Sequence, residues 1–126
     1  TAYFGLRDAQ GTSDVGALEQ RWRALRAELE AWSRLRGKPF VFTEVGYRSR
    51  KGASASPWDE TSGGEPDVDE QRRAFEAFRR AWRGSPALVG LYVWNWYGFG
   101  GPTSVGYTPR GKPAADEVKR LLAPVW

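Results

Sequence analysis

The most regular hydrophobic pattern in this chain alternates steps of four and three residues, through Leu18, Trp22, Leu25, Leu29 and Trp32. This spacing predicts an amphipathic helix of about six turns whose apolar side packs on a core. Candidate N-caps lie at residues 12–14, and Gly37 follows a basic last turn as a left-handed stop. The first long segment of the chain is therefore expected to be one helix.

Two further helices are predicted downstream. One is capped by Asp67 or Asp69, and it ends before Gly84 and Pro86. Its expected buried stripe consists of Ala74, Phe75, Phe78 and Trp82. The other spans residues 114–122 and follows Pro113, which suits a first helical turn.

Two apolar runs, residues 38–47 and 87–97, are too short for helices and are bounded by Gly and Pro or by polar loops. They are typical of strands buried on both faces, which occur mostly in parallel α/β sheets. Residues 2–4 are expected to be the end of an earlier strand. With no dinucleotide or phosphate-binding glycine motif, the order of elements favours a doubly wound fold or a piece of a β/α barrel.

The predicted loop at residues 48–66 is too long to be a simple connection, since loops of more than about 12 to 15 residues are usually binding loops or lids. It contains Trp58, which belongs to no helical stripe. Contact with a sugar or other ligand and packing that anchors the loop both remain open for this side chain.

The composition indicates one domain or part of one, with 126 residues of which 40% are hydrophobic. The first residue is not Met, so we expect a piece of a larger protein. No apolar stretch approaches the roughly 18 residues of a membrane span, and no membrane partner is predicted. The sequence does not indicate a cellular compartment.

Cysteine and histidine are both absent, which excludes thiol nucleophiles, Ser-His triads and the usual zinc ligand sets. We therefore predict no metal or other cofactor. The net charge is +4, but the arginines alternate with glutamates along the predicted helices. Such mixed faces are typical of a solvated surface, so nucleic acid is not an expected partner.

Glu44 is the candidate catalytic residue, because it ends the first complete strand and chemistry sits at the carboxyl ends of parallel strands. The alternative is a glutamate that turns to solvent or pairs with an arginine such as Arg48. The residue pattern alone leaves both interpretations open.

The sequence resembles the C-terminal part of Glycoside Hydrolase Family 113, the β-mannanase-type barrels of clan A. The resemblance runs from Tyr3 to about Leu122 and is carried by residues 42–49 (FTEVGYRS), 57–58 (PW), 90–96 (GLYVWNW) and 109–114 (PRGKPA). It implies that residues 1–126 are the C-terminal portion of a single catalytic (β/α)8 barrel domain. Since a full barrel takes about 250 residues, the chain would supply roughly three of the eight β/α units.

The resemblance also implies the roles of individual residues. Glu44 corresponds to the family's nucleophile, Tyr3 to a tyrosine that orients it, and Trp94 or Trp96 to an aromatic floor for the sugar. We assign substrate binding to Trp94, Trp96, Asn95, Trp58 and Tyr47. The implied function is retaining hydrolysis of β-mannan or a related β-glycan, of the endo-β-1,4-mannanase type, which requires the remainder of the barrel as a partner.

A retaining mechanism needs two carboxyl groups roughly 5 to 5.5 Å apart, and only one is identified here. The family's acid/base is a glutamate of an earlier strand, so this segment alone is expected to be inactive. Asp8, Asp59 and Glu60 are loop carboxylates that could approach Glu44, although solvated surface positions are their expected role. The alternative function is a non-catalytic carbohydrate-binding module that uses the aromatic residues alone.

Overall fold

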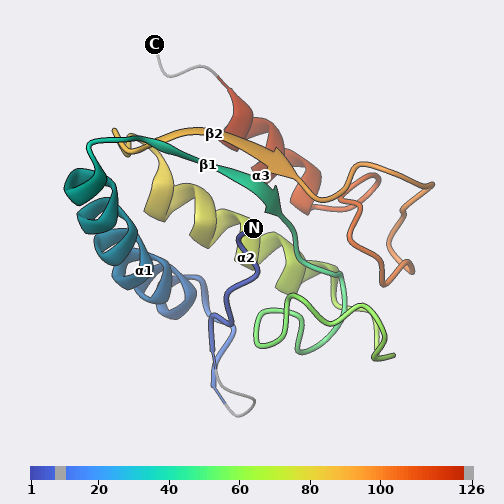
Figure 1. Ribbon diagram of the computed structural model, residues 1–126. Coiled ribbons are helices and arrows are strands. Elements are labelled where there is room, and N and C mark those ends of the chain that lie inside the picture. The colour runs from blue at the N-terminus through green and yellow to red at the C-terminus, as the bar shows by residue number, and fades with distance from the viewer. Residues whose placement is uncertain (8–10, 124–126) are drawn as a thin grey trace.

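The computed structural model describes residues 1–7 and 11–123, which form three helices and two strands (Figure 1). In chain order these are α1 (Val15–Arg36), β1 (Phe40–Val45), α2 (Val68–Trp82), β2 (Leu88–Val93) and α3 (Ala114–Leu122). The predicted order and type of these elements are confirmed, and so is the α/β class. Within the described part of the chain, no helix has the length and apolar character needed to cross a bilayer.

The helix ends follow the capping residues of the sequence. The carboxylate of Asp14 accepts hydrogen bonds from the amides of Gly16 and Ala17, which α1 leaves without helical partners. Gly37 ends the same helix with φ 61°, a left-handed conformation that glycine adopts without steric cost. Of the two candidate caps of α2, Asp67 is the one used, and its carboxylate accepts from the Glu70 amide.

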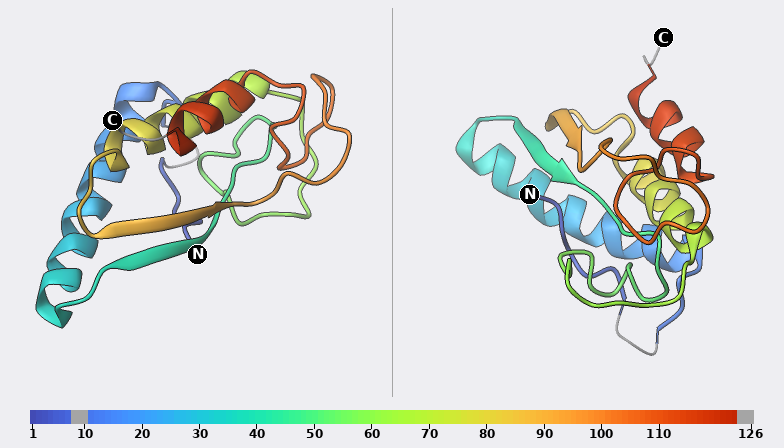
Figure 2. Two further views of the ribbon diagram at one scale, coloured as in Figure 1. Left: turned by 90° about the horizontal axis from the view of Figure 1, so that it is seen from above. Right: turned by 90° about the vertical axis from the view of Figure 1, so that its right-hand side faces the viewer.

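Strands β1 and β2 pair in parallel and form a two-stranded sheet. All three helices lie on one side of this sheet (Figure 2). The prediction that the strands are covered on both faces is wrong for the described residues, since Val41 keeps 46% of its surface exposed. The helices supply only one covering layer. Alternate residues such as Phe42 meet that layer, and their neighbours do not.

The core between helices and sheet is largely aromatic. Trp22 of α1 is fully buried and makes edge-to-face contacts with Phe78 and Trp82 of α2, with ring centroids 5.1 and 6.1 Å apart. Phe42 of β1 meets Trp82 in the same way at 5.1 Å. Such pairs stabilise beyond their buried area, by about 0.5–1.5 kcal/mol each.

Trp32 departs from its predicted packing role, since 49% of its surface is exposed although it continues the apolar stripe of α1. It lies in the second half of the helix and borders an open apolar groove together with Phe4, Leu29, Phe40 and Val41. Nothing in the described chain fills this groove. The stripe thus predicted the apolar side of the helix correctly but not which of its members are covered.

Candidate active site

A register shift in β1 turns Glu44 away from the helices. Phe42 and Val45 both belong to the helix-facing core, although regular alternation would put residues three apart on opposite faces. The pairing with β2 shifts between these two positions, because β1 advances three residues from Phe42 to Val45 while β2 advances two, from Leu91 to Val93. The extra residue brings Val45 into the core and leaves Glu44 half-buried at the end of the strand.

Tyr3 lies next to Glu44, on the side of β1 opposite to β2. Residues 2–4 form no strand, but the Ala2 amide donates a hydrogen bond of 2.7 Å to the Glu44 carbonyl and so fixes the segment beside β1. Burial first, and then the hydrogen bond and the negative charge of Glu44, raise the pKa of Tyr3 far above its ordinary value of 10.0. The phenol therefore remains protonated and can donate to the Glu44 carboxylate.

A cleft opens beside this pair. It is lined by Arg48, Glu60, Trp94, Asn95, Gly106 and Tyr107. The ring of Tyr107 meets that of Tyr3 edge to face, with centroids 6.2 Å apart. Tyr107 thus connects the cleft to Tyr3, which lies beside the candidate nucleophile.

Trp94 and Asn95 line the same cleft although they are neighbours in sequence. Strand β2 ends at Val93, so the alternation of side chains does not continue through these residues. The Trp94–Asn95 peptide bond is cis, and the Trp94 amide still donates to the Val45 carbonyl at 2.8 Å. Trp94 is thereby held one strand away from Glu44, with 40% of its surface exposed.

Two of the other predicted substrate contacts do not line this cleft. Trp96 follows Asn95 and is 46% exposed, and Trp58 is 57% exposed. The ring of Trp58 lies beside Gly5, since a Cβ at Gly5 would come within 3.6 Å of it. Both indoles are accessible, and their contact with a sugar stays a prediction.

The prediction that Tyr47 binds substrate is wrong. Tyr47 is fully buried, its ring packs edge to face on Phe75 at 5.2 Å, and its hydroxyl accepts a hydrogen bond from Trp22 Nε1 at 3.0 Å. Burial raises the pKa of this phenol, which keeps it neutral. Val45, Gly46 and Tyr47, which follow the register shift, are all buried, and Tyr47 is not among the residues that line the cleft.

Two of the charged side chains proposed to approach Glu44, those of Arg48 and Asp59, are engaged elsewhere. Arg48 donates to the backbone carbonyls of Val105, Glu60 and Ser62, and among residues 1–7 and 11–123 no ion pair includes Glu44. Asp59 pairs with Arg50 at 3.1 Å, and hydrogen bonds from Ser62 and Thr61 lower its pKa. Asp8 lies outside the described residues. Of the two loop carboxylates that the structure describes, Glu60 lines the cleft and Asp59 does not.

Sequence reasoning missed Tyr107, which follows a glycine-rich loop and carried no pattern of its own. Its position is fixed by Gln71 of α2, whose Nε2 donates to the carbonyls of Tyr47 and Tyr107, both at 2.8 Å. Nearby, the buried Lys112 donates to Ser49 Oγ at 2.7 Å and to the Gly106 carbonyl, and burial lowers its pKa to about 8. The loop wall of the cleft is therefore joined to α2 and to the segment that follows β1.

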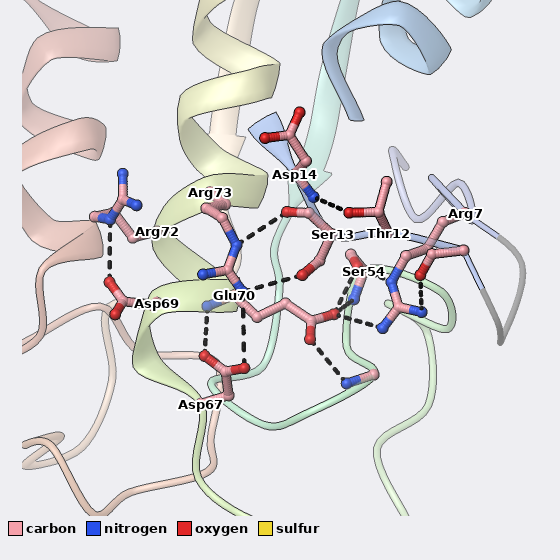
Figure 3. Close-up of polar contacts among 12 residues, drawn as sticks. Arg7, Thr12, Ser13, Asp14, Ser54, Asp67, Asp69, Glu70, Arg72 and Arg73 are labelled. Carbon is pink, nitrogen blue, oxygen red and sulfur yellow. Dashed lines mark hydrogen bonds and ion pairs between the residues drawn. The ribbon is translucent and has the colours of Figure 1, made fainter. Parts of the chain in front are cut away.

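The long loop after β1 is organised by the buried carboxylate of Glu70, on the first turn of α2 (Figure 3). Its oxygens accept hydrogen bonds from the amides of Gly52 and Ser54, at 3.0 and 2.9 Å, and from the Ser54 hydroxyl. Arg7 pairs with it at 3.3 Å. Burial opposes its ionisation, but the hydrogen bonds and the Arg7 charge outweigh burial and lower the pKa of Glu70 below 4.5.

Replacing Glu70 with Gln is expected to lower the free energy of unfolding by about 3 kcal/mol near neutral pH, because a buried charge pair loses one partner. The amides of Gly52 and Ser54 should also lose protection from hydrogen exchange in the full-length protein. Asp69→Asn is the matched control, since Asp69 sits on the same turn and forms an exposed pair with Arg72. It should change stability by roughly 0.5 kcal/mol or less.

The effect of Glu70 should also depend on pH. A carboxyl group whose folded pKa is lowered contributes its full stability above its unfolded pKa, near 4.5, and loses it as pH falls through the folded value. The stability difference between wild type and Glu70→Gln should therefore be constant above about pH 4.5 and shrink in acid. An equal difference at every pH would contradict a role based on the charge of Glu70.

Comparison with solved structures shows which proteins this chain resembles. A β-mannanase from Alicyclobacillus acidocaldarius, AaManA, solved in complex with ManMIm, is 36% identical with a TM-score of 0.72, over 81% of this chain and 34% of that one. Two structures of GH113 β-1,4-mannanases, one of them a complex, are alike in fold. They are 22% and 24% identical, with TM-scores of 0.77 and 0.74, and cover 95% and 82% of this chain.

The chain spans about a third of each of these structures, and none of the curated proteins matches it. The sequence model of Glycoside Hydrolase Family 113 matches residues 2–100, which include Tyr3, Glu44 and the tryptophans at the end of β2. A match over most of the chain, together with a relative above 30% identity, establishes the assignment. The chain belongs to Glycoside Hydrolase Family 113.

Proposed function

We propose that this chain is the C-terminal portion of a single (β/α)8 catalytic domain, about three of its eight units, in a retaining glycoside hydrolase. The domain would cleave β-1,4-mannan or a related β-glycan, as the names of the similar structures suggest. Two features support the barrel: the sheet bears helices on one side only, and the chain covers 34 to 36% of the similar structures. The other strands would cover the open face of β1.

The observation that carries the proposal is the position of Glu44, at the carboxyl end of β1, turned away from the helices and beside the protonated hydroxyl of Tyr3. In the first step, a Glu44 oxygen bonds to the anomeric carbon while the glycosidic C–O bond breaks. An acid/base glutamate from the remainder of the barrel protonates the leaving oxygen. Water then attacks the glycosyl ester, gives its proton to the same glutamate, and releases the Glu44 carboxylate.

Tyr3 and Trp94 would support this reaction in different ways. The Tyr3 hydroxyl would donate to the carboxylate and fix the direction of its attacking oxygen. The accessible ring of Trp94 would offer an apolar face to the sugar and hold the anomeric carbon within reach of Glu44. Trp96 and Trp58 would extend contact with the glycan.

The test is covalent labelling of the full-length enzyme with a slow 2-fluoro-β-mannoside inactivator, followed by peptide mass spectrometry. We expect the label on Glu44, because the fluorine slows hydrolysis of the glycosyl ester. A label on another carboxylate would remove Glu44 from the role of nucleophile. A protein that binds mannan but neither hydrolyses it nor takes up the label would instead be the binding module.

A further inference from the structure

The segment 57–62 of the long loop is held against the wall of the cleft. The Tyr107 hydroxyl donates to the Pro57 carbonyl at 2.7 Å, and Arg48 donates to the carbonyls of Glu60 and Ser62 at 3.2 and 2.7 Å. The Asp59 carboxylate closes a turn by accepting from the amides of Thr61 and Ser62. The backbone at Glu60 is thus fixed at the rim of the cleft by contacts on both sides.

Within the part of the chain that the structure describes, the Glu60 side chain has no ion-pair partner that would explain this arrangement. It is exposed and lines the cleft with Trp94, Asn95 and Tyr107. Within residues 1–7 and 11–123, the contact made to Glu60 by Arg48 goes to its backbone carbonyl, and its carboxylate takes part in no ion pair. After burial, its charge is the largest influence that raises the pKa of Tyr107, and it also acts on Tyr3.

An exposed glutamate is ordinarily only solvated, but its surroundings here are those of a sugar site. An ionised carboxylate has two oxygens that accept hydrogen bonds only, so it matches the hydroxyl groups of a polyol. The Trp94 ring in the same cleft provides an apolar face, and the Asn95 amide provides a further polar group. Fixing the backbone in advance lowers the ordering cost of binding.

We propose that Glu60 is a substrate-binding and specificity-determining residue that accepts hydrogen bonds from hydroxyl groups of a neutral sugar unit bound against Trp94. This inference rests on the proposed function, because it concerns the glycan cleaved at Glu44. Glu60 has no part in bond cleavage here. Its effect is on the affinity for the glycan and on the choice among glycans.

The experiment measures binding of mannotetraose by calorimetry to the full-length enzyme carrying Glu44→Gln, which keeps the ligand intact. Adding Glu60→Ala is expected to raise Kd roughly tenfold or more, because charge-assisted hydrogen bonds are lost. The control is Glu65→Ala, which removes the same charge from the same loop outside the cleft and should leave Kd unchanged. An unchanged Kd in Glu60→Ala would overturn the proposal.

Mono-deoxy analogues of the ligand separate recognition from an indirect effect on the loop. With Glu60 present, the analogue that lacks the bound hydroxyl should bind roughly tenfold more weakly, and Glu60→Ala should bind it as well as the parent sugar. If Glu60→Ala weakens binding but keeps the same discrimination, the residue acts only on loop structure and the proposal fails. If the enzyme neither binds nor hydrolyses mannan, both the proposed function and this inference fail. If the enzyme hydrolyses mannan and Glu60→Ala leaves Kd unchanged, only this inference is overturned.

Discussion

Replacing Glu44 with Gln in the full-length enzyme is expected to lower kcat for β-mannan by roughly 10⁴-fold or more, because the amide oxygen is a poor nucleophile. The amide keeps the size of the side chain and can still accept a hydrogen bond from Tyr3, so the fold and the affinity for mannan should persist. Steady-state kinetics with an aryl β-mannoside, paired with calorimetric binding of a mannooligosaccharide, gives the two readouts. A variant that retains a tenth of the activity would contradict a nucleophilic role.

Tyr3→Phe provides the comparison within the same site. It removes one hydrogen bond to a charged group but leaves the attacking atom, so kcat should fall by only roughly 10- to 100-fold. Tyr47→Phe is the matched control, since it deletes a tyrosine hydroxyl that lies in the core and accepts from Trp22. That variant should lose stability while kcat of the folded enzyme stays unchanged. Equal losses of kcat in both variants would show that Tyr3 acts through the fold.

The elements of the fold could be predicted because their signals are local. The helix stripe, the Asp14 cap and the Gly37 stop lie within a few residues of the structure that they determine, and α1 begins and ends as they indicate. The position of Glu44 at the end of β1 could be predicted in the same way, since it follows from one apolar run in the sequence. The family resemblance then supplied Tyr3, which no pattern singles out.

The side chains around Glu44 could not be predicted because they depend on contacts between distant segments. The register shift in β1 appears only when β2 is beside it, and it decides that Tyr47 enters the core. Tyr107 reaches the cleft because Gln71, 36 residues earlier, holds its carbonyl. The exposure of Trp32 likewise depends on which segments pack against α1. The hydrophobic period of the helix gives no information about those segments.

The close approach of Gly46 to Trp94 ties the two halves of the site together. A Cβ at Gly46 would lie 2.0 Å from the Trp94 carbonyl oxygen and 3.3 Å from its Cβ. Separations under 3.0 Å are not tolerated, so any side chain must push the end of β2 away from β1 by about 1 Å. The hydrogen bond from the Trp94 amide to the Val45 carbonyl lies beside this contact and resists that movement.

Gly46→Ala is therefore expected to lower kcat/KM for mannan by roughly 100-fold, since a displacement near 1 Å in a site costs about that much. It should also lower the free energy of unfolding by about 1–3 kcal/mol through overpacking. Gly63→Ala is the control, because it adds the same methyl group to the following loop where nothing lies within 4 Å. Wild-type kinetics in Gly46→Ala would mean that β2 can shift freely, so that the position of Trp94 relative to Glu44 does not set the rate.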